Sequence, residues 1–181
     1  MTATERRKLA LVRDGELAPE VGLWLAALHD TRQRMREVLT KLPDELIDRV
    51  PPDGGSSIGT LLYHIALIET DWLLFDILGR PESEWPRDLF PVDHRLADAT
   101  LSPFTGDTLE QHLARLKTVR TMLVDAVRTM SADQLHELRP RDDYDVSAAW
   151  VLHHLMQHEA EHRSQIGSVR ESLERQREPT G

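Results

Sequence analysis

Residues 146–174, VSAAWVLHHLMQHEAEHRSQIGSVRESLE, predict the longest helix of this chain. Apolar residues recur there at the spacing of a single helix face. They are Val151, Leu155, Ile166, Val169 and Leu173. His158 and His162 fill the missing turns of that face, so two polar rings occupy positions that would otherwise belong to a hydrophobic core.

Three other segments show the same helical period. We expect these helices at residues 19–41, at residues 58–78, and from Asp107 or Thr108 to Met130. Ser56 or Ser57 is placed to cap the second helix, and Gly79 to end it. Helices therefore account for most of the chain, with almost no strand.

The connection between the second and third helices, residues 80–106, contains four prolines and shows no sustained pattern. A connection this long inside one domain is explained when it carries the chain from one end of a bundle to the other. We therefore predict an all-α fold, a four-helix bundle with a long crossover between helices two and three. One domain is expected to span residues 1–181.

Composition excludes several classes of protein. The chain has 181 residues and no cysteine, which rules out a disulfide scaffold, a thiolate metal site and a cysteine nucleophile. Its formal charge is −9 and its basic residues form no block, so we expect no nucleic-acid partner. No stretch is expected to reach the roughly 18 apolar residues of a membrane span, and no apolar run follows the N-terminal basic residues. We expect a cytoplasmic protein without a membrane partner.

His158 and His162 project from adjacent turns of one helix face, an arrangement that offers two nitrogens to one metal ion. His154 lies too far along the axis for all three rings to converge, so a third ligand must come from a facing helix. His64 lies on the flank of the second helix's apolar face and is the best candidate. Three neutral histidines suit zinc, nickel, cobalt, copper or ferrous iron. The alternative is a metal-free polar network or a pH-sensitive joint.

Residues 158–162 also match the H-E-x-x-H signature of zinc proteases, in which Glu159 would be the general base. The extended form of that signature is absent, because Arg163, Ser164, Gln165 and Ile166 follow. No strand is predicted that could align a peptide substrate. We therefore discount the protease hypothesis and expect Glu159 to have a structural or supporting role.

These residues resemble a known family, the DinB-like four-helix bundles, which include bacillithiol- and mycothiol-dependent S-transferases. The resemblance covers about residues 20–175. Its best signatures are GSSI at 55–58, LLYHI at 61–65 with Glu69 and Trp72, VLHH at 151–154, and HEAEHRSQI at 158–166. The family's metal triad maps onto His64, His158 and His162. The family often has glycine where this chain has Ser164, a departure that leaves the ligands unchanged.

The resemblance implies a divalent metal, with zinc expected and nickel, cobalt or iron as alternatives, and often a homodimer. It implies a metal-dependent S-transferase or a related hydrolase that activates a low-molecular-weight thiol or water for a small-molecule electrophile. Arg163 and Gln165 are candidate cofactor contacts, with a surface role as the alternative. A non-catalytic, dimeric metal-binding or stress-response module is the alternative function. The thiol, the substrate and the metal are not decided by the sequence.

Overall fold

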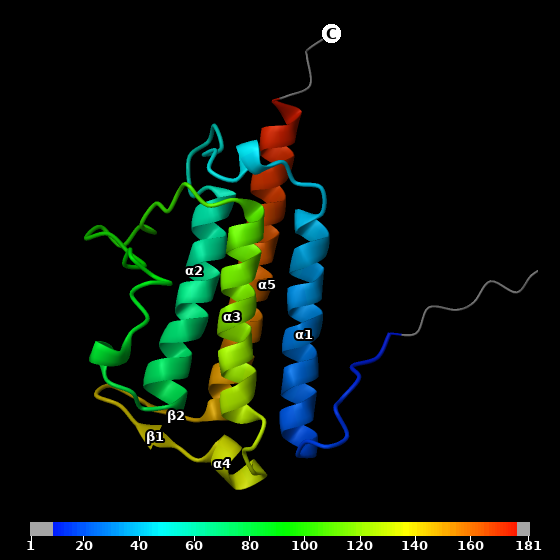
Figure 1. Ribbon diagram of the computed structural model, residues 1–181, viewed down its shortest axis with the longest axis vertical. Coiled ribbons are helices and arrows are strands. Elements are labelled where there is room, and N and C mark those ends of the chain that lie inside the picture. Colours follow the sequence, from blue (N-terminus) through cyan, green and yellow to red (C-terminus); the bar gives the residue numbers. More distant parts are fainter. Residues whose placement is uncertain (1–8, 177–181) are drawn as a thin grey trace, which may run out of the picture.

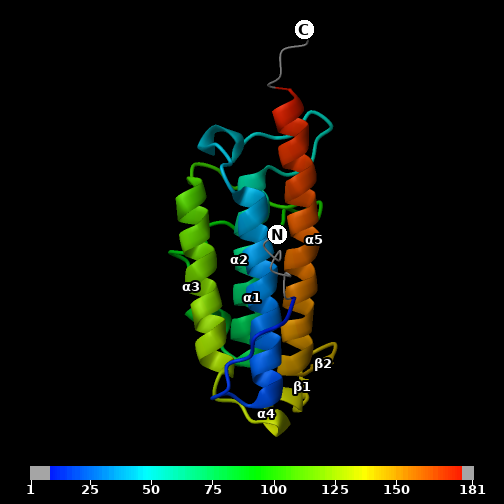
Figure 2. The same ribbon diagram turned by 90° about the vertical axis from the view of Figure 1, so that its right-hand side faces the viewer.

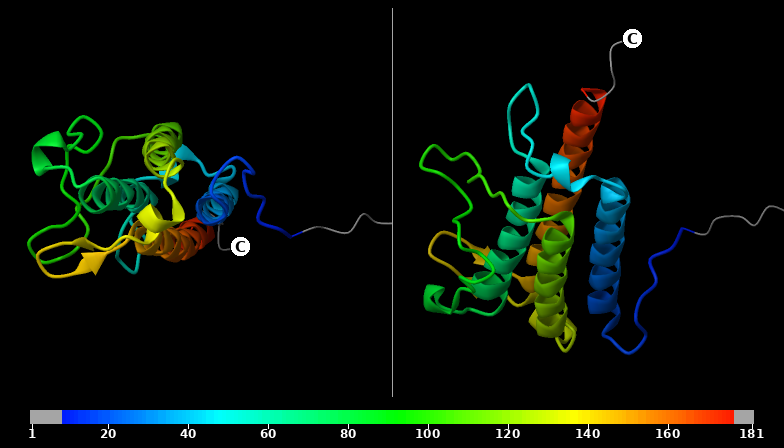
Figure 3. Two further views of the ribbon diagram at one scale, coloured as in Figure 1. Left: turned by 90° about the horizontal axis from the view of Figure 1, so that it is seen from below. Right: turned by 45° about the horizontal axis from the view of Figure 1, so that its top comes forward.

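The computed structural model describes residues 9–176, so the first residues of the N-terminal segment and the tail at 177–181 lie outside the description. Four long helices run along its longest axis (Figure 1). They are α1 (Pro19–Leu39), α2 (Ile58–Asp71), α3 (Leu109–Val127) and α5 (Ala148–Arg175). Seen end on, they occupy the four corners of a bundle, with α1 diagonally opposite α2 (Figure 3). The predicted all-α bundle is confirmed.

The chain direction explains the long crossover. Helices α1 and α5 run one way and α2 and α3 run the other way, so the successive helices α2 and α3 are parallel (Figure 1). The crossover returns the chain along the outside of α2 before α3 begins, as predicted. It contains one short 3₁₀ turn, η3 (Glu82–Glu84), and an isolated antiparallel bridge between Arg95 and Leu101.

The helix ends follow the capping residues. Ser57 accepts a hydrogen bond from the Thr60 backbone N–H at the start of α2, and Gly79 adopts a φ of +61° beyond its end. The expected uniform helix to residue 78 was wrong in one respect, because Trp72–Ile77 (η2) is π-helical. Periodicity did not reveal this change in hydrogen bonding, which shifts the register of the side chains beyond Asp71.

The remaining elements are short connections. A 3₁₀ turn, η1 (Asp44–Leu46), lies between α1 and α2. Beyond α3, the short helix α4 (Ala132–His136) and a two-stranded hairpin close the lower end of the bundle, which Figure 2 shows from the side. The hairpin pairs β1 (Arg139–Pro140) with β2 (Asp145–Val146) in antiparallel register.

Tyr63 fastens the crossover to α2. Its hydroxyl donates a 2.6 Å hydrogen bond to the Val92 carbonyl and accepts a 3.0 Å bond from the Val92 N–H. Its ring stacks on Phe104 at a centroid distance of 4.0 Å and meets Phe90 edge on. Both polar groups of Val92 are thereby satisfied, which holds this part of an irregular segment in one place.

The expectation that no stretch approaches the length of a membrane span was wrong for Ile58–Ile77. Among the described residues, this segment is long and apolar enough to cross a membrane. However, 78% of its most apolar 18-residue stretch is buried inside the protein. Burial of that extent is the property of a core helix.

A buried ion-pair network joins the four long helices. It consists of Arg32 on α1, Glu69 on α2, Arg120 on α3 and Glu159 on α5. Arg32 Nη2 lies 2.8 Å from Glu69 Oε2, and Arg120 Nη2 lies 2.8 Å from Glu159 Oε2. Each carboxylate is shared by both arginines, so each of the four charges has two opposite partners.

The opposite charges of this network stabilise one another in their ionised forms. Burial alone would raise the pKa of Glu69, but the charges and hydrogen bonds of Arg120 and Arg32 more than offset it and lower that pKa. Burial alone would likewise lower the pKa of Arg120, and Glu69 and Glu159 raise it instead. Glu69 and Arg120 therefore remain ionised, and the loss of one member of the network leaves an uncompensated buried charge.

We predict that Glu69→Gln destabilises the fold by roughly 3–5 kcal/mol, the cost of breaking a buried ion pair from one side. Urea unfolding followed by circular dichroism measures the change. The matched control is Asp30→Asn, which breaks the exposed Asp30–Arg34 pair on α1 and should leave the unfolding midpoint unchanged. Equal midpoints for Glu69→Gln and the unsubstituted protein would contradict a structural role for the network.

Candidate metal centre

Helices α2 and α5 bring three histidines together. His64 comes from α2, and His158 and His162 come from adjacent turns of α5. His158 Nε2 lies 3.2 Å from His64 Nε2 and 3.0 Å from His162 Nε2. One ring nitrogen of each side chain lies within 4.8 Å of those of the other two, so this three-histidine group could hold a metal ion.

The position of His158 Nε2 between two other ring nitrogens favours a shared cation. A neutral imidazole nitrogen carries either one proton or one lone pair, so it can make one good hydrogen bond. His158 Nε2 has two such neighbours at hydrogen-bonding distance. Ligands at 2.0–2.1 Å around a tetrahedral zinc ion lie roughly 3.3 Å apart, which is close to both of these separations.

The three imidazoles are held in the neutral form that metal binding requires. Burial is the largest cause, and it lowers the pKa of both His64 and His158 to about 3. The charges of neighbouring histidines and of Arg95 add to the effect. Burial also lowers the pKa of His162, against a smaller opposing effect of its bond to Gln165.

The two predicted cofactor contacts lie in different places. Gln165 Oε1 lies 2.8 Å from His162 Nδ1, so the amide oxygen can accept the Nδ1–H and leave the Nε2 lone pair toward the group. Arg163 instead lines an open hollow on the α1 side, with Arg34, Glu37 and Val38. A cofactor contact by Arg163 or Gln165 stays a prediction. Within the described residues, His64 Nδ1 is buried without a hydrogen-bond partner, so the polar contact of that ring is the one between its Nε2 and His158.

The carboxylate of Glu159 is bound by two arginines and is not free to act on a ligand at the three histidines. Both of its oxygens accept hydrogen bonds from Arg32, and Arg120 binds Oε2 at 2.8 Å. A general base needs a carboxylate oxygen free to take a proton. The geometry therefore agrees with the structural role expected from the sequence and offers no support for protease chemistry.

A pocket of about 480 Å³ lies between the crossover and α2, beginning one turn beyond His64 at Leu67. Asp71 and Phe75 line its inner wall, and the crossover contributes His94 and Arg95. Burial raises the pKa of Asp71, partly opposed by His94. Arg95, which lines this pocket, is also close enough for its charge to lower the pKa of all three histidines.

Aromatic rings line the other direction along α5. His154 stacks on Trp150 with centroids 5.1 Å apart and an interplanar angle of 6°, and Trp72 contacts both rings. Trp72 and Trp150 border a hollow of about 250 Å³ together with Tyr144.

The sequence analysis did not identify Arg95 as a neighbour of the histidines, because a residue in an irregular crossover has no periodicity to place it beside a helix.

The chain is therefore a four-helix bundle in which two helices form a three-histidine group that could hold a metal ion. The sequence profile described as the DinB superfamily matches residues 27–166, most of the chain, and the chain therefore belongs to that superfamily. A solved structure, a conserved protein from Enterococcus faecalis, is similar in fold, with a TM-score of 0.65. The alignment has 14% sequence identity and covers 83% of this chain and 95% of that one. No curated protein matches the chain.

His112 on α3 lies outside the three-histidine group. It is 1% exposed and meets Phe104 edge on, and its Nε2 has no hydrogen-bond partner among residues 9–176. Burial, with a smaller contribution from the charge of Arg115, lowers its pKa from 6.5 to about 4. Asp107 and Asp48 oppose the shift without cancelling it.

We predict that His112 makes the fold acid-sensitive between about pH 6.5 and pH 4. Its folded pKa lies below its unfolded value, so the unfolded chain binds more protons in this range and stability falls as the pH falls. The slope is on the order of 1 kcal/mol per pH unit. Urea unfolding at several pH values should show a shallower decline for His112→Gln than for the unsubstituted protein. Parallel curves would contradict the assignment.

Proposed function

We propose that this protein is a metal-dependent S-transferase that binds a divalent ion through His64, His158 and His162. Its substrates would be a low-molecular-weight thiol and a small electrophile, with water replacing the thiol in a related hydrolase. The observation that carries the proposal is the convergence of three neutral ring nitrogens from two helices. Membership of the DinB superfamily supports it.

The donor set fits a borderline transition metal. Three imidazoles suit zinc, nickel, cobalt or ferrous iron, whereas calcium and magnesium require oxygen ligands. Within residues 9–176, no aspartate or glutamate joins the three histidines in the group. Three protein ligands are the number typical of catalytic zinc sites, which keep a coordination position for a substrate. We propose zinc as the resident ion.

A divalent ion in this site would supply charge that lowers the pKa of a thiol or water molecule. The protein's own side chains would prepare the site for that chemistry. Gln165 would fix the tautomer of His162, because its amide oxygen accepts the Nδ1–H. Burial would keep His64 and His158 unprotonated at neutral pH, and packing of α2 against α5 would hold their separation.

The crossover pocket is our proposed site for the electrophile. It adjoins the histidines and carries Arg95, whose charge would attract an electron-rich leaving group or an anionic substrate. In the transfer, the thiol would lose its proton to solvent, and its sulfur would form a bond to the electrophilic carbon as the leaving group departs with its electron pair. The bonds of Tyr63 to Val92 would hold the crossover over this pocket.

We predict that protein purified without a histidine tag binds about one zinc ion per chain, measured by elemental analysis and by competition with a chelating dye. His158→Ala should weaken binding by more than about 100-fold, because loss of a ligand exceeds the 10–100-fold effect of losing a supporting group. Gln165→Leu should fall within that smaller range. His94→Ala, in the crossover, is the matched control and should bind normally. Undiminished zinc in His158→Ala would make the assignment wrong.

We predict that the zinc-loaded protein consumes a small thiol in the presence of a panel of electrophiles, and that a chelator abolishes this activity. Readdition of zinc should restore it, and His158→Ala should lack it. Product mass should equal the thiol plus the electrophile minus the protonated leaving group. Thiol consumption that continues at the same rate in the presence of the chelator would contradict the enzyme hypothesis. Tight zinc binding without turnover of thiols or water would favour the non-catalytic module instead.

A further inference from the structure

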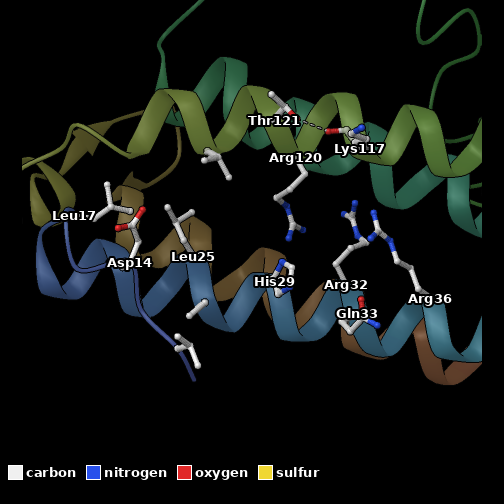
Figure 4. A pocket seen from close by; sticks show the side chains of 14 residues that line it. Asp14, Leu17, Leu25, His29, Arg32, Gln33, Arg36, Lys117, Arg120 and Thr121 are labelled. Carbon is white, nitrogen blue, oxygen red and sulfur yellow. Dashed lines mark hydrogen bonds between the residues drawn. The ribbon is translucent and has the colours of Figure 1, made fainter. Parts of the chain in front are cut away.

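A second pocket lies between α1 and α3, away from the three histidines. The two helices are neighbouring corners of the bundle, and a cavity of about 380 Å³ opens between them. This volume is within the range of small-molecule sites. Figure 4 shows Arg32 and Arg36 from α1 and Arg120 from α3 projecting into the space between the two helices, with Asp14 and Leu17 on the segment that precedes α1. We call it the α1–α3 pocket, and its lining includes Leu17, Leu25, Arg36, Lys117, Arg120 and Val124.

The two ends of the α1–α3 pocket differ in polarity. Leu17 and Leu25 lie together at one end, whereas Arg36 and Lys117 lie at the other (Figure 4). His29 and Gln33 add polar groups from α1 near the cationic end. Asp14 lies at the apolar end, where its carboxylate would repel a second negative charge on a ligand.

Two of the cations in the pocket are already committed. Arg32 and Arg120 belong to the ion-pair network, and each also bonds the backbone of the opposite helix. Arg120 makes four hydrogen bonds, to Glu69, Glu159 and the Leu28 carbonyl, out of the five N–H groups of a guanidinium. These arginines therefore form a rigid, nearly saturated floor.

Arg36 and Lys117 are different, because no ion pair in the described part of the chain involves either of them. They come from two helices and face one space, with an apolar wall one or more turns away. A carboxylate between them would gain two charge-assisted contacts. A hydrocarbon attached to it would reach Leu25 and Val124 and bury apolar surface.

We propose that the α1–α3 pocket binds a small amphipathic monoanion, a carboxylate with an apolar tail. Its carboxylate lies between Arg36 and Lys117, and its tail lies against Leu17, Leu25 and Val124. The pocket shares no lining residue with the three-histidine group, which lies where α2 packs against α5. The proposal therefore does not rest on the proposed transferase activity.

The test uses octanoate as the probe and isothermal titration calorimetry with the full-length protein. We expect saturable binding of octanoate, and weaker binding of acetate, which has no tail, and of octanol, which has no charge. Arg36→Gln combined with Lys117→Gln should weaken octanoate binding at least about tenfold, since each charged hydrogen bond contributes more than one unit of log Kd. Both side chains are exposed, so the double variant should fold normally.

Arg34→Gln is the matched control, because Arg34 is on the same helix but lines a different hollow. It should bind octanoate like the unsubstituted protein, as should His158→Ala. Unchanged octanoate affinity in the Arg36/Lys117 double variant would overturn the proposal, as would octanol binding as tightly as octanoate. Loss of octanoate binding in His158→Ala would place the carboxylate at the metal centre and also overturn it. Absence of saturable octanoate binding would overturn it outright.

Discussion

The shared ion pairs of Arg32, Glu69, Arg120 and Glu159 constrain the whole bundle, because each of the four long helices supplies one member. Apolar ridges and grooves alone allow neighbouring helices to slide or rotate at modest cost. Buried charges do not, since displacement of one leaves the others without compensation. The network therefore fixes the rotation of each helix about its own axis, and with it the direction in which the functional side chains project.

The consequence is clearest on α5, where adjacent residues serve different regions. Glu159 enters the network, while His158, the residue before it, projects toward His64 on α2. Consecutive residues on a helix are about 100° apart, so fixing Glu159 also fixes the face that carries His158 and His162. On α2, His64 and Glu69 are five residues apart, which is about 140° around the helix, so fixing Glu69 likewise fixes the face that carries His64. The three-histidine group is thus oriented by a set of interactions that it does not contain.

The sequence predicted the parts of this protein that depend on periodicity. The helical stripes located the four helices, and the interruptions at His158 and His162 indicated a site whose third member had to come from the facing helix. It did not reveal the network, because Glu69 lies on a largely apolar helix and its two partners, Arg32 and Arg120, lie on two other helices far away in the sequence. Nor did it place Arg163, whose direction on α5 depends on which side α1 packs. The π-helical turn was missed because its hydrophobic pattern resembles that of an α-helix.

The same network explains why a pocket exists between α1 and α3. Arg32 extends from α1 to the Leu116 carbonyl on α3, and Arg120 extends back to the Leu28 carbonyl on α1. Two guanidinium groups between the helices hold them apart at this level, so small apolar side chains cannot close the space by packing directly. Elsewhere in the bundle, α1 packs on α5 and α2 packs on both α3 and α5. The charges that align the helices for one site thus leave room for another on the far side of the molecule.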